Sequence, residues 1–386
     1  MKILICTNSL GARGGIERVT IVKANALASI KGVDVAICYT DKGTYPYDTI
    51  CPISPLVKVI DTGVTFWDLY PLSIKKLFYE ATIKFIRLRK TISNIIADYK
   101  PDVVVSTGSY EKYALASILP SHITGHPVIK IREYHFGSDY RKYITQTLIA
   151  HLAGIFEDKV LSRFFDMNFL LTKEDLDMNH KNRQRFSYRH NPLCIEYINF
   201  QRRTNTVIAV GRLTDQKNHI SLLRIWASIA DKAGDWELWI AGEGELRSEL
   251  GNAAAKLGIA KSVKFLGFRK DIAQILSSCK ILALTSKYEG FGLCITEAMA
   301  CGTVPISFRT PYGPADIINH NQDGILVDYM NEEQFADNLI SLIHNPDRIA
   351  DMSQRAIIRA QDFDADRISA SWIETYQNLL GEKNPI

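Results

Sequence analysis

Residues 286–297 read SKYEGFGLCITE and place two glutamates, Glu289 and Glu297, on either side of a glycine-rich turn. The apolar run 281–284 before them predicts a buried strand, and residues 296–301 predict the first turns of a helix. A turn at the start of a helix exposes backbone N–H groups that suit an anionic phosphate. Ionised carboxylates accept hydrogen bonds from hydroxyls. Hydroxyls on both sides of a phosphate indicate a sugar nucleotide as the ligand.

The rest of the chain alternates short apolar runs with longer helical patterns. Strands separated by helices favour an α/β fold with parallel sheets built from βαβ units. Because twelve strands are too many for one compact sheet, we expect two sets of six that divide near residues 190–205. The expected strands are residues 2–7, 33–39, 57–60, 103–106, 128–131, 167–171, 206–210, 237–241, 263–266, 281–284, 304–307 and 324–327.

Composition excludes several classes of protein. The chain of 386 residues is 46% hydrophobic and 23% charged, as is usual for a globular protein. Its net charge of +4 does not favour a nucleic-acid binder, which would concentrate basic residues in a stripe. Seven scattered cysteines, none in a Cys-x-x-Cys pair, indicate reduced thiols in a cytoplasmic protein.

We expect neither a metal site nor a membrane-spanning segment. His122 and His126 are four residues apart, but Gly125 and Pro127 break the helix that would aim them at one metal. No apolar run has the length of a signal peptide or of a bilayer span. We therefore expect a cytoplasmic protein without a metal cofactor, with attachment to the inner face of the membrane left open.

Two glycine-containing loops follow expected strands. Gly14 and Gly15 lie between the first strand and a helix, where they would let a phosphate approach the backbone. Read from Gly11, the spacing does not fit Gly-x-Gly-x-x-Gly, so a dinucleotide loop is disfavoured and a plain tight turn remains an alternative. In the loop 242–244 neighbouring glutamates would repel a pyrophosphate, so we expect it to shape the nucleoside side of a pocket.

A basic loop follows the strand 206–210. It begins at Gly211 and contains Arg212 and Lys217, which can converge on one pyrophosphate, the arginine as a bidentate fork and the lysine as a point charge. Ligands of open α/β sheets bind at the carboxyl ends of strands, which is where this loop lies. The alternative is a solvated surface loop.

The chain resembles glycosyltransferase family four in three motifs that occur in the same order: the Gly14–Gly15 loop, the Gly211–Lys217 loop and the Glu289/Glu297 pair. The resemblance is strong over residues 207–328 and looser before them. It implies retaining enzymes of the GT-B fold, with two Rossmann-like domains facing across a cleft and a C-terminal helix that crosses back to the N-terminal domain. Residues 310–318 depart from the usual family pattern and resemble a subgroup that builds bacterial cell-surface polysaccharide and lipopolysaccharide.

The resemblance also implies roles for individual residues. Arg212 and Lys217 would hold the diphosphate and stabilise the leaving group. Glu297 would accept hydrogen bonds from the ribose, and Glu289 would hold the donor sugar. Other implied donor-binding positions are Gly14, Gly15, Gly211, Phe268, Arg269, and the backbone of Phe291, Gly292 and Leu293.

A histidine, His135, follows the expected strand 128–131, where the family often has one near the reacting sugar. The resemblance implies a catalytic role for it. Two alternatives stay open: His135 supports the loop structure, or Glu133 takes the role instead.

Two long helices are expected outside the loops. Residues 73–99 have helical apolar spacing and a basic second face, which is either solvated or in contact with an anionic membrane or an acidic acceptor. Phe66, Trp67 and Tyr70 precede this helix and favour the second reading slightly. Residues 366–380 predict the C-terminal helix, which packs either on the N-terminal domain or on its own domain.

These expectations combine into one account. Residues 1–193 with 367–386 would form an acceptor-binding domain and residues 194–366 a donor-binding domain. The chain would transfer a sugar from a nucleoside diphosphate sugar, with UDP favoured, to a lipid-linked oligosaccharide or lipopolysaccharide, without a metal and without a covalent intermediate. The alternatives are a nucleotide-sugar epimerase of the same fold and a non-catalytic sugar-nucleotide-binding subunit.

Overall fold

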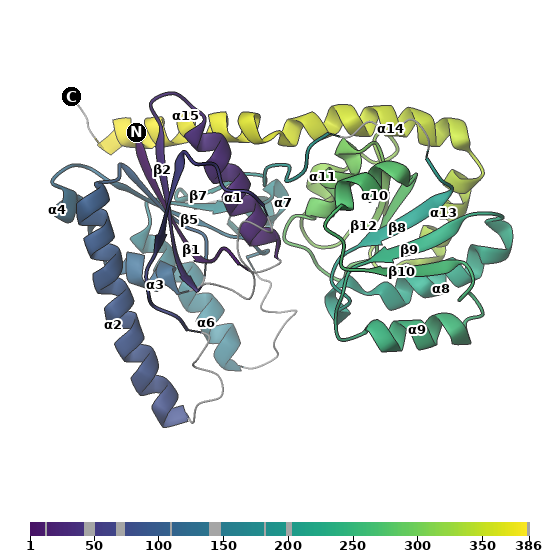
Figure 1. Cartoon of the computed structure of the whole chain (residues 1–386), viewed down its shortest axis with the longest axis horizontal. Helices are drawn as coiled ribbons and strands as arrows, with labels where there is room; N and C mark the ends of the chain where they lie inside the picture. The colour runs from purple at the N-terminus through teal and green to yellow at the C-terminus, as the bar shows by residue number, and fades with distance from the viewer. Residues whose placement is uncertain are drawn as a thin grey trace. The chain divides into compact units, whose positions relative to one another are not determined.

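The computed structural model describes residues 1–11, 14–41, 51–66, 74–108, 110–138, 148–180, 183–197 and 203–383, apart from the side chains of 74–79 and 148–150. It divides the chain into two compact units (Figure 1). The first unit is Met1–Pro192 with Ala365–Ile386, and the second is Leu193–Asp364. These limits lie within two residues of the boundaries expected from the sequence.

The first unit contains a parallel sheet in the order β3-β2-β1-β4-β5-β6-β7. Its first six strands occur where the sequence predicts them, but the sheet has a seventh, so the expected six was wrong. All three residues of that seventh strand are half-buried and give no apolar run. The strands are β1 (Lys2–Ser9), β2 (Asp34–Asp41), β3 (Val57–Asp61), β4 (Val103–Ser106), β5 (Ile129–Glu133), β6 (Met167–Leu170) and β7 (Phe186–Tyr188).

Helices cover both faces of this sheet. On one face α15 packs against α1, and Trp372 of α15 makes an edge contact with Phe169 at 4.5 Å between ring centroids. The other face packs against α2 and α3. The expected return of the C-terminal helix to the first unit is therefore confirmed. The helices are α1 (Gly15–Ala28), α2 (Ile74–Tyr99), α3 (Glu111–Ala116), α4 (Pro120–Thr124), α6 (Leu148–Lys159), η3 (Leu161–Phe164), α7 (Lys173–Asp175), η4 (Leu176–His180) and α15 (Ala365–Lys383).

The second unit contains the other parallel sheet, in the order β10-β9-β8-β11-β12-β13, with its core between the sheet and the surrounding helices. The strands are β8 (Thr206–Val210), β9 (Glu237–Ala241), β10 (Val263–Gly267), β11 (Ile281–Leu284), β12 (Val304–Phe308) and β13 (Ile325–Val327). The helices are η5 (Asp215–Lys217), α8 (His219–Ile229), η6 (Ala230–Lys232), α9 (Arg247–Lys256), α10 (Ile272–Ser278), α11 (Leu293–Ala300), α12 (Pro314–Ile317), α13 (Glu332–Ile343), α14 (Pro346–Ala360) and η7 (Gln361–Phe363).

Each sheet has a point where the strand order reverses. In the first unit β1 lies between β2 and β4, and in the second β8 lies between β9 and β11. The loops that leave two such neighbouring strands in opposite directions open a crevice at their carboxyl ends, where ligands of α/β sheets bind. The loops after β8 and β11 are the two that the sequence singles out.

Helix α11 begins at Leu293, three residues before the expected start at Thr296. Gly292 precedes it with a φ of 97°, a left-handed conformation that glycine adopts without strain. Glu297 consequently lies in the second turn of the helix rather than in its first turn.

Candidate active site

The loops after β8 and β11 are joined to each other. The backbone N–H of Lys287 donates to the carbonyl of Gln216 at 2.8 Å. The side-chain amide of Gln216 donates to the carbonyl of Tyr288 at 3.1 Å, and Lys287 Nζ lies 2.5 Å from the carboxylate of Asp215. These contacts fix the position of one loop against the other across the point where the strand order reverses.

The central contact of this site is an ion pair between Lys217 and Glu289. Lys217 Nζ donates to Glu289 Oε1 at 2.6 Å, and Ser286 Oγ donates to the same oxygen, also at 2.6 Å. Burial lowers the pKa of Lys217, but the charge of Glu289, the hydrogen bond to it and the nearby Cys294 thiol together raise the pKa above its ordinary value. A lysine that stays charged is thus held on the inner side of the loop.

Glycine at position 211 makes room for this lysine. A Cβ on Gly211 would lie 3.1–3.3 Å from three carbons of the Lys217 side chain. A Cβ on Gly242 would overlap the carbonyl oxygen of Gly211, and one on Gly244 would overlap that of Leu213. The glycines of the loop after β9 are therefore explained by close backbone packing on the Gly211 loop.

We expect Gly242→Ala to lower the unfolding temperature and to weaken nucleotide binding. The added methyl would overlap the carbonyl of Gly211 and so push Gly211 out of its packing against the Lys217 side chain. The matched control is Gly251→Ala inside α9, where a Cβ would meet only the end of the Arg247 side chain at 3.2 Å. Since alanine favours a helix interior, this control should be neutral or more stable by about 0.5–1 kcal/mol. Equal unfolding temperatures for the two variants, measured by calorimetry, would contradict the packing argument.

The turn before α11 is fixed by one buried aromatic side chain and by close backbone packing. Phe291 is buried, and its ring meets Phe363 edge-on at 5.7 Å between centroids. Gly313 adopts a φ of 88° and packs so closely on Phe291 that a Cβ would overlap its carbonyl oxygen. The first N–H groups of an α-helix have no intrahelical acceptor, so the N–H groups near Leu293 are suited to an anion.

Glu297 belongs to the same charged cluster. Its side chain is buried on α11, one turn after Cys294. Burial raises the pKa of the Cys294 thiol to about 12, and the charges of Lys217, Glu289 and Glu297 all act on it. The structure therefore brings Lys217, Glu289 and Glu297 together around Cys294.

Phe268 and Arg269, which by the family resemblance would flank the base of the donor, lie elsewhere on the sheet. Phe268 and Arg269 follow β10, which is two strands away from β8, or roughly 10 Å. Both are exposed, and Arg269 pairs with Asp271 at 2.6 Å, which raises the pKa of the guanidinium. Arg212 is also exposed, with a long contact of 3.5 Å to Gln216. These three residues are not in the buried cluster.

In the first unit, Gly14 and Gly15 begin α1 as expected. The sequence reading missed Glu17, which accepts a hydrogen bond from the backbone N–H of Gly14. Burial raises the pKa of the Glu17 carboxyl, and the N–H groups oppose that rise. A glutamate three residues after an N-cap is a known signal for such a contact. The N-terminus of α1 is thus already in contact with a carboxylate of the protein, that of Glu17.

His135 lines a pocket at the carboxyl ends of β4 and β5. Burial lowers the pKa of its imidazole to about 4, and its Nε2 has no hydrogen-bond partner among the described residues. Glu133, the proposed competitor, forms a buried ion pair with Lys23. The pocket is lined by Ile16, Thr107, Gly108, Lys112, Arg132, Glu133, Tyr134, His135, Phe136, Ser138, Gly154, Glu157 and Asp158.

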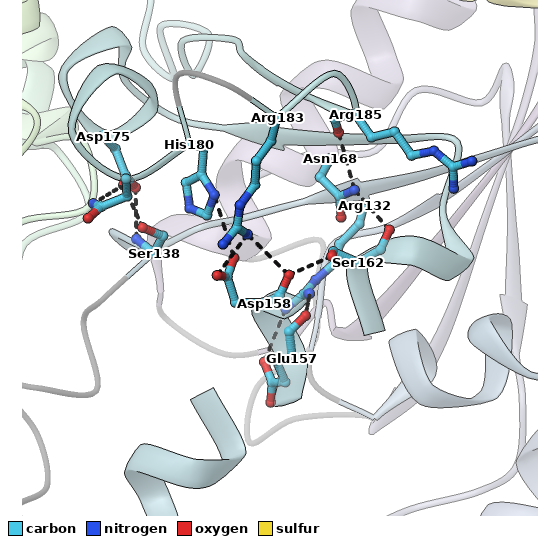
Figure 2. A network of polar contacts seen from close by, with 11 residues as sticks. Arg132, Ser138, Glu157, Asp158, Ser162, Asn168, Asp175, His180, Arg183 and Arg185 are labelled. Atoms are coloured by element: carbon cyan, nitrogen blue, oxygen red, sulfur yellow. Dashed lines mark hydrogen bonds and ion pairs between the residues drawn. The ribbon is translucent and has the colours of Figure 1, made fainter. Parts of the chain in front are cut away.

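A polar network that the sequence analysis did not predict includes four residues that line this pocket, Arg132, Ser138, Glu157 and Asp158 (Figure 2). Asp175 accepts hydrogen bonds from the backbone N–H of Ser138 at 2.7 Å and from its hydroxyl at 2.5 Å. It thereby fixes Ser138, three residues after His135. Arg132 donates to Glu157 at 3.0 Å on the other side of the pocket.

Comparison with known proteins finds similarity to glycosyltransferases. Residues 196–359 match the family model "Glycosyl transferases group 1". The chain is 28% identical over 377 residues to an uncharacterized glycosyltransferase of Haemophilus influenzae, covering 96% of this chain and 98% of that one. It is 27% identical to the amylovoran biosynthesis glycosyltransferase AmsD of Erwinia amylovora, with coverage of 96% and 98%.

A solved structure extends the match in three dimensions. Anabaena Alr3699/HepE in complex with UDP and glucose superimposes with a TM-score of 0.73 at 20% identity, covering 98% of this chain and 100% of that one. The fold is GT-B. The family match and the named relatives support the assignment of this chain as a glycosyltransferase. Within this GT-B chain the family match covers Lys217, Glu289 and Glu297 but stops short of Gly14 and His135.

Proposed function

We propose that the chain is a retaining glycosyltransferase of family four that moves a sugar from a nucleoside diphosphate sugar, with UDP favoured, to an acceptor hydroxyl. The observation that carries this proposal is the ion pair between half-buried Lys217 and buried Glu289, 2.6 Å apart, beside the N-terminus of α11 at the reversal point of the sheet. The UDP in the HepE structure supports the choice of nucleotide.

The acceptor we propose is a lipid-linked oligosaccharide or lipopolysaccharide at the cytoplasmic face of a bacterial membrane. The role named for AmsD in amylovoran biosynthesis supports a cell-surface polysaccharide as the product. No helix in the described ranges has the length and apolar character needed to cross a bilayer. The sequence pattern at residues 310–318 points to the same subgroup.

The chemistry follows from where negative charge develops. As the bond between the anomeric carbon and the phosphate oxygen breaks, its electron pair stays on the phosphate. Lys217, Arg212 and the N–H groups at the start of α11 would stabilise that charge, because prearranged donors act most strongly on charge formed in the transition state. The acceptor oxygen bonds the anomeric carbon from the same face, and its proton passes to the leaving phosphate. Glu289 and Glu297 bind substrate and do not act as nucleophiles.

The reaction as proposed uses no metal, since protein groups supply the positive charge. We expect addition of a chelator to leave the transfer rate unchanged, and loss of all activity would reject this part of the proposal. Trapping of a covalent sugar on Glu289 would likewise reject the proposed mechanism.

The test of function is the product. A donor panel is incubated with and without acceptor glycan, and the products are followed by NMR. The proposal predicts sugar transfer with the donor's anomeric configuration retained. Isomerised donor in the absence of acceptor would instead indicate an epimerase, and binding without any turnover would indicate a non-catalytic subunit.

Glu297 offers a test of the ribose contact. Glu297→Ala should weaken nucleotide binding about ten- to a hundredfold, because a hydrogen bond to a charged group is worth roughly 1.5–3 kcal/mol. Glu249→Ala on the exposed side of α9 serves as a control and should leave the affinity unchanged. An unchanged affinity in the Glu297 variant, measured by calorimetric titration, would count against the ribose role.

A further inference from the structure

Helix α6 has its polarity reversed with respect to the protein core. Glu157 is buried, whereas Leu152 and Phe156 of α6 and Phe164 of the following η3 turn keep 54%, 48% and 52% of their surfaces exposed. A surface helix normally buries its apolar stripe and exposes its charges. Contacts on the inner side must therefore hold Glu157 in place, and the exposed apolar side chains on the outer side are available to bind a partner.

Ion pairs on the inner side fix this orientation. Glu157 accepts from Lys112 at 2.8 Å, from Tyr113 at 2.6 Å and from Arg132 at 3.0 Å. The next residue, Asp158, pairs with Arg183 at 2.8 Å (Figure 2). Turning α6 to bury its apolar side chains would break all of these contacts.

The outer side carries a row of exposed residues that runs from α6 through Val160 into η3, and we call it the α6 stripe. It contains five large apolar side chains and two cations, all exposed: Leu152, Ile155, Phe156, Lys159, Val160, Arg163 and Phe164. Arg185 donates to the carbonyl of Arg163 at 2.8 Å and adds a third exposed cation beside the stripe. Contiguous exposed apolar side chains mark interaction surfaces.

We infer that the α6 stripe is a docking surface for an anionic lipid bilayer. Aromatic and aliphatic side chains on one face with lysine and arginine between them fit the boundary between headgroups and acyl chains. The two carboxylates of residues 151–164 are both paired with basic side chains, the buried Glu157 with Arg132 and the half-buried Asp158 with Arg183. A second copy of the stripe would oppose like charges at Lys159 and Arg163, which disfavours self-association.

This inference deepens the proposed function and rests on it for its purpose, since a lipid-linked acceptor lies at a membrane. Docking through α6 would hold the first unit at that membrane. Binding itself requires no substrate and can be measured separately from catalysis.

The experiment is flotation of the full chain with phosphatidylcholine vesicles, with and without phosphatidylglycerol. The wild type should float with the anionic vesicles and not with pure phosphatidylcholine. The double variant Phe156→Ser/Phe164→Ser should bind about ten- to a hundredfold more weakly. Lys159→Gln/Arg163→Gln should lose roughly fivefold per cation. The matched control is Ile358→Ser on α14, an apolar side chain of the second unit that is 65% exposed, and it should bind like the wild type.

Several outcomes would overturn the inference: no flotation of the wild type, equal loss in the Ile358 control, or unchanged binding in both stripe variants. A concentration-dependent dimer that the phenylalanine variant abolishes, without vesicle binding, would assign the stripe to self-association instead. Stabilisation by nucleotide, measured on the same samples, shows that each variant is folded. If the wild type binds nucleotide but does not float with anionic vesicles, the docking surface is rejected and the proposed function stands.

Discussion

Lys217→Gln is expected to lower kcat for sugar transfer by about 10²- to 10³-fold, the usual cost of removing one donor to charge that develops in the transition state. The lysine is held 2.6 Å from Glu289 by the loops after β8 and β11, so the charge is fixed before substrate arrives. Glutamine keeps a polar N–H donor on a side chain that is one bond shorter, and it removes the charge. Single-turnover kinetics with saturating donor measures the effect.

A lysine on the partner loop provides the control for this variant. Lys287 pairs with Asp215, a largely exposed carboxylate in the same pair of loops. An exposed ion pair contributes roughly 0–1 kcal/mol, so Lys287→Gln should change kcat little. Similar losses in the two variants would show that the loops, rather than the Lys217 charge, determine the rate.

Glu157→Gln should destabilise the first unit by about 3–5 kcal/mol, because Lys112 and Arg132 would remain buried without their carboxylate. For a unit of this size the unfolding temperature should fall by roughly 6–20 °C. The control is Glu237→Gln, which breaks a half-exposed pair with Lys264 and should cost about 1 kcal/mol or less. Calorimetry of both variants measures whether the buried ion pairs of Glu157 contribute this much to the free energy of unfolding.

The same cluster predicts a pH dependence. Burial raises the pKa of Glu157, but Lys112, Tyr113 and Arg132 lower it more, so the folded pKa is below the ordinary value. The stabilisation is present above the unfolded pKa of the carboxyl and is lost as the pH falls through the lowered folded pKa. The wild type should therefore lose stability in this acid range faster than Glu157→Gln does. Parallel acid profiles for the two proteins would contradict the assignment.

The sequence predicts the second unit well because its signals are local. Buried parallel strands appear as apolar runs, and loops after them carry the charged residues. From these one can place Lys217 and Glu289 at the same edge of the sheet. The exception is the start of α11, where Gly292 in a left-handed conformation begins the helix three residues earlier than the apolar pattern indicates.

What the sequence could not supply depends on contacts between distant residues. Strand β7 has three half-buried residues and, within the part of the chain that the structure describes, pairs with β6 alone. Glu157 belongs to an amphipathic pattern that reads as a helix with its charges outside, yet Arg132 and Lys112 from other elements hold it inside. The apolar residues of α6 would thus be assigned to the core from sequence alone.

The most direct measurement of the central claim is thermal unfolding of the wild type and Lys217→Gln across a panel of nucleotide sugars. A nucleoside diphosphate sugar at 100 times its dissociation constant should stabilise the wild type by about 2.7 kcal/mol, and UDP-sugars should be among those that do so. The variant should respond less to the same ligand. If no nucleotide sugar stabilises the wild type, or if the variant responds equally, the loops after β8 and β11 are not the donor site.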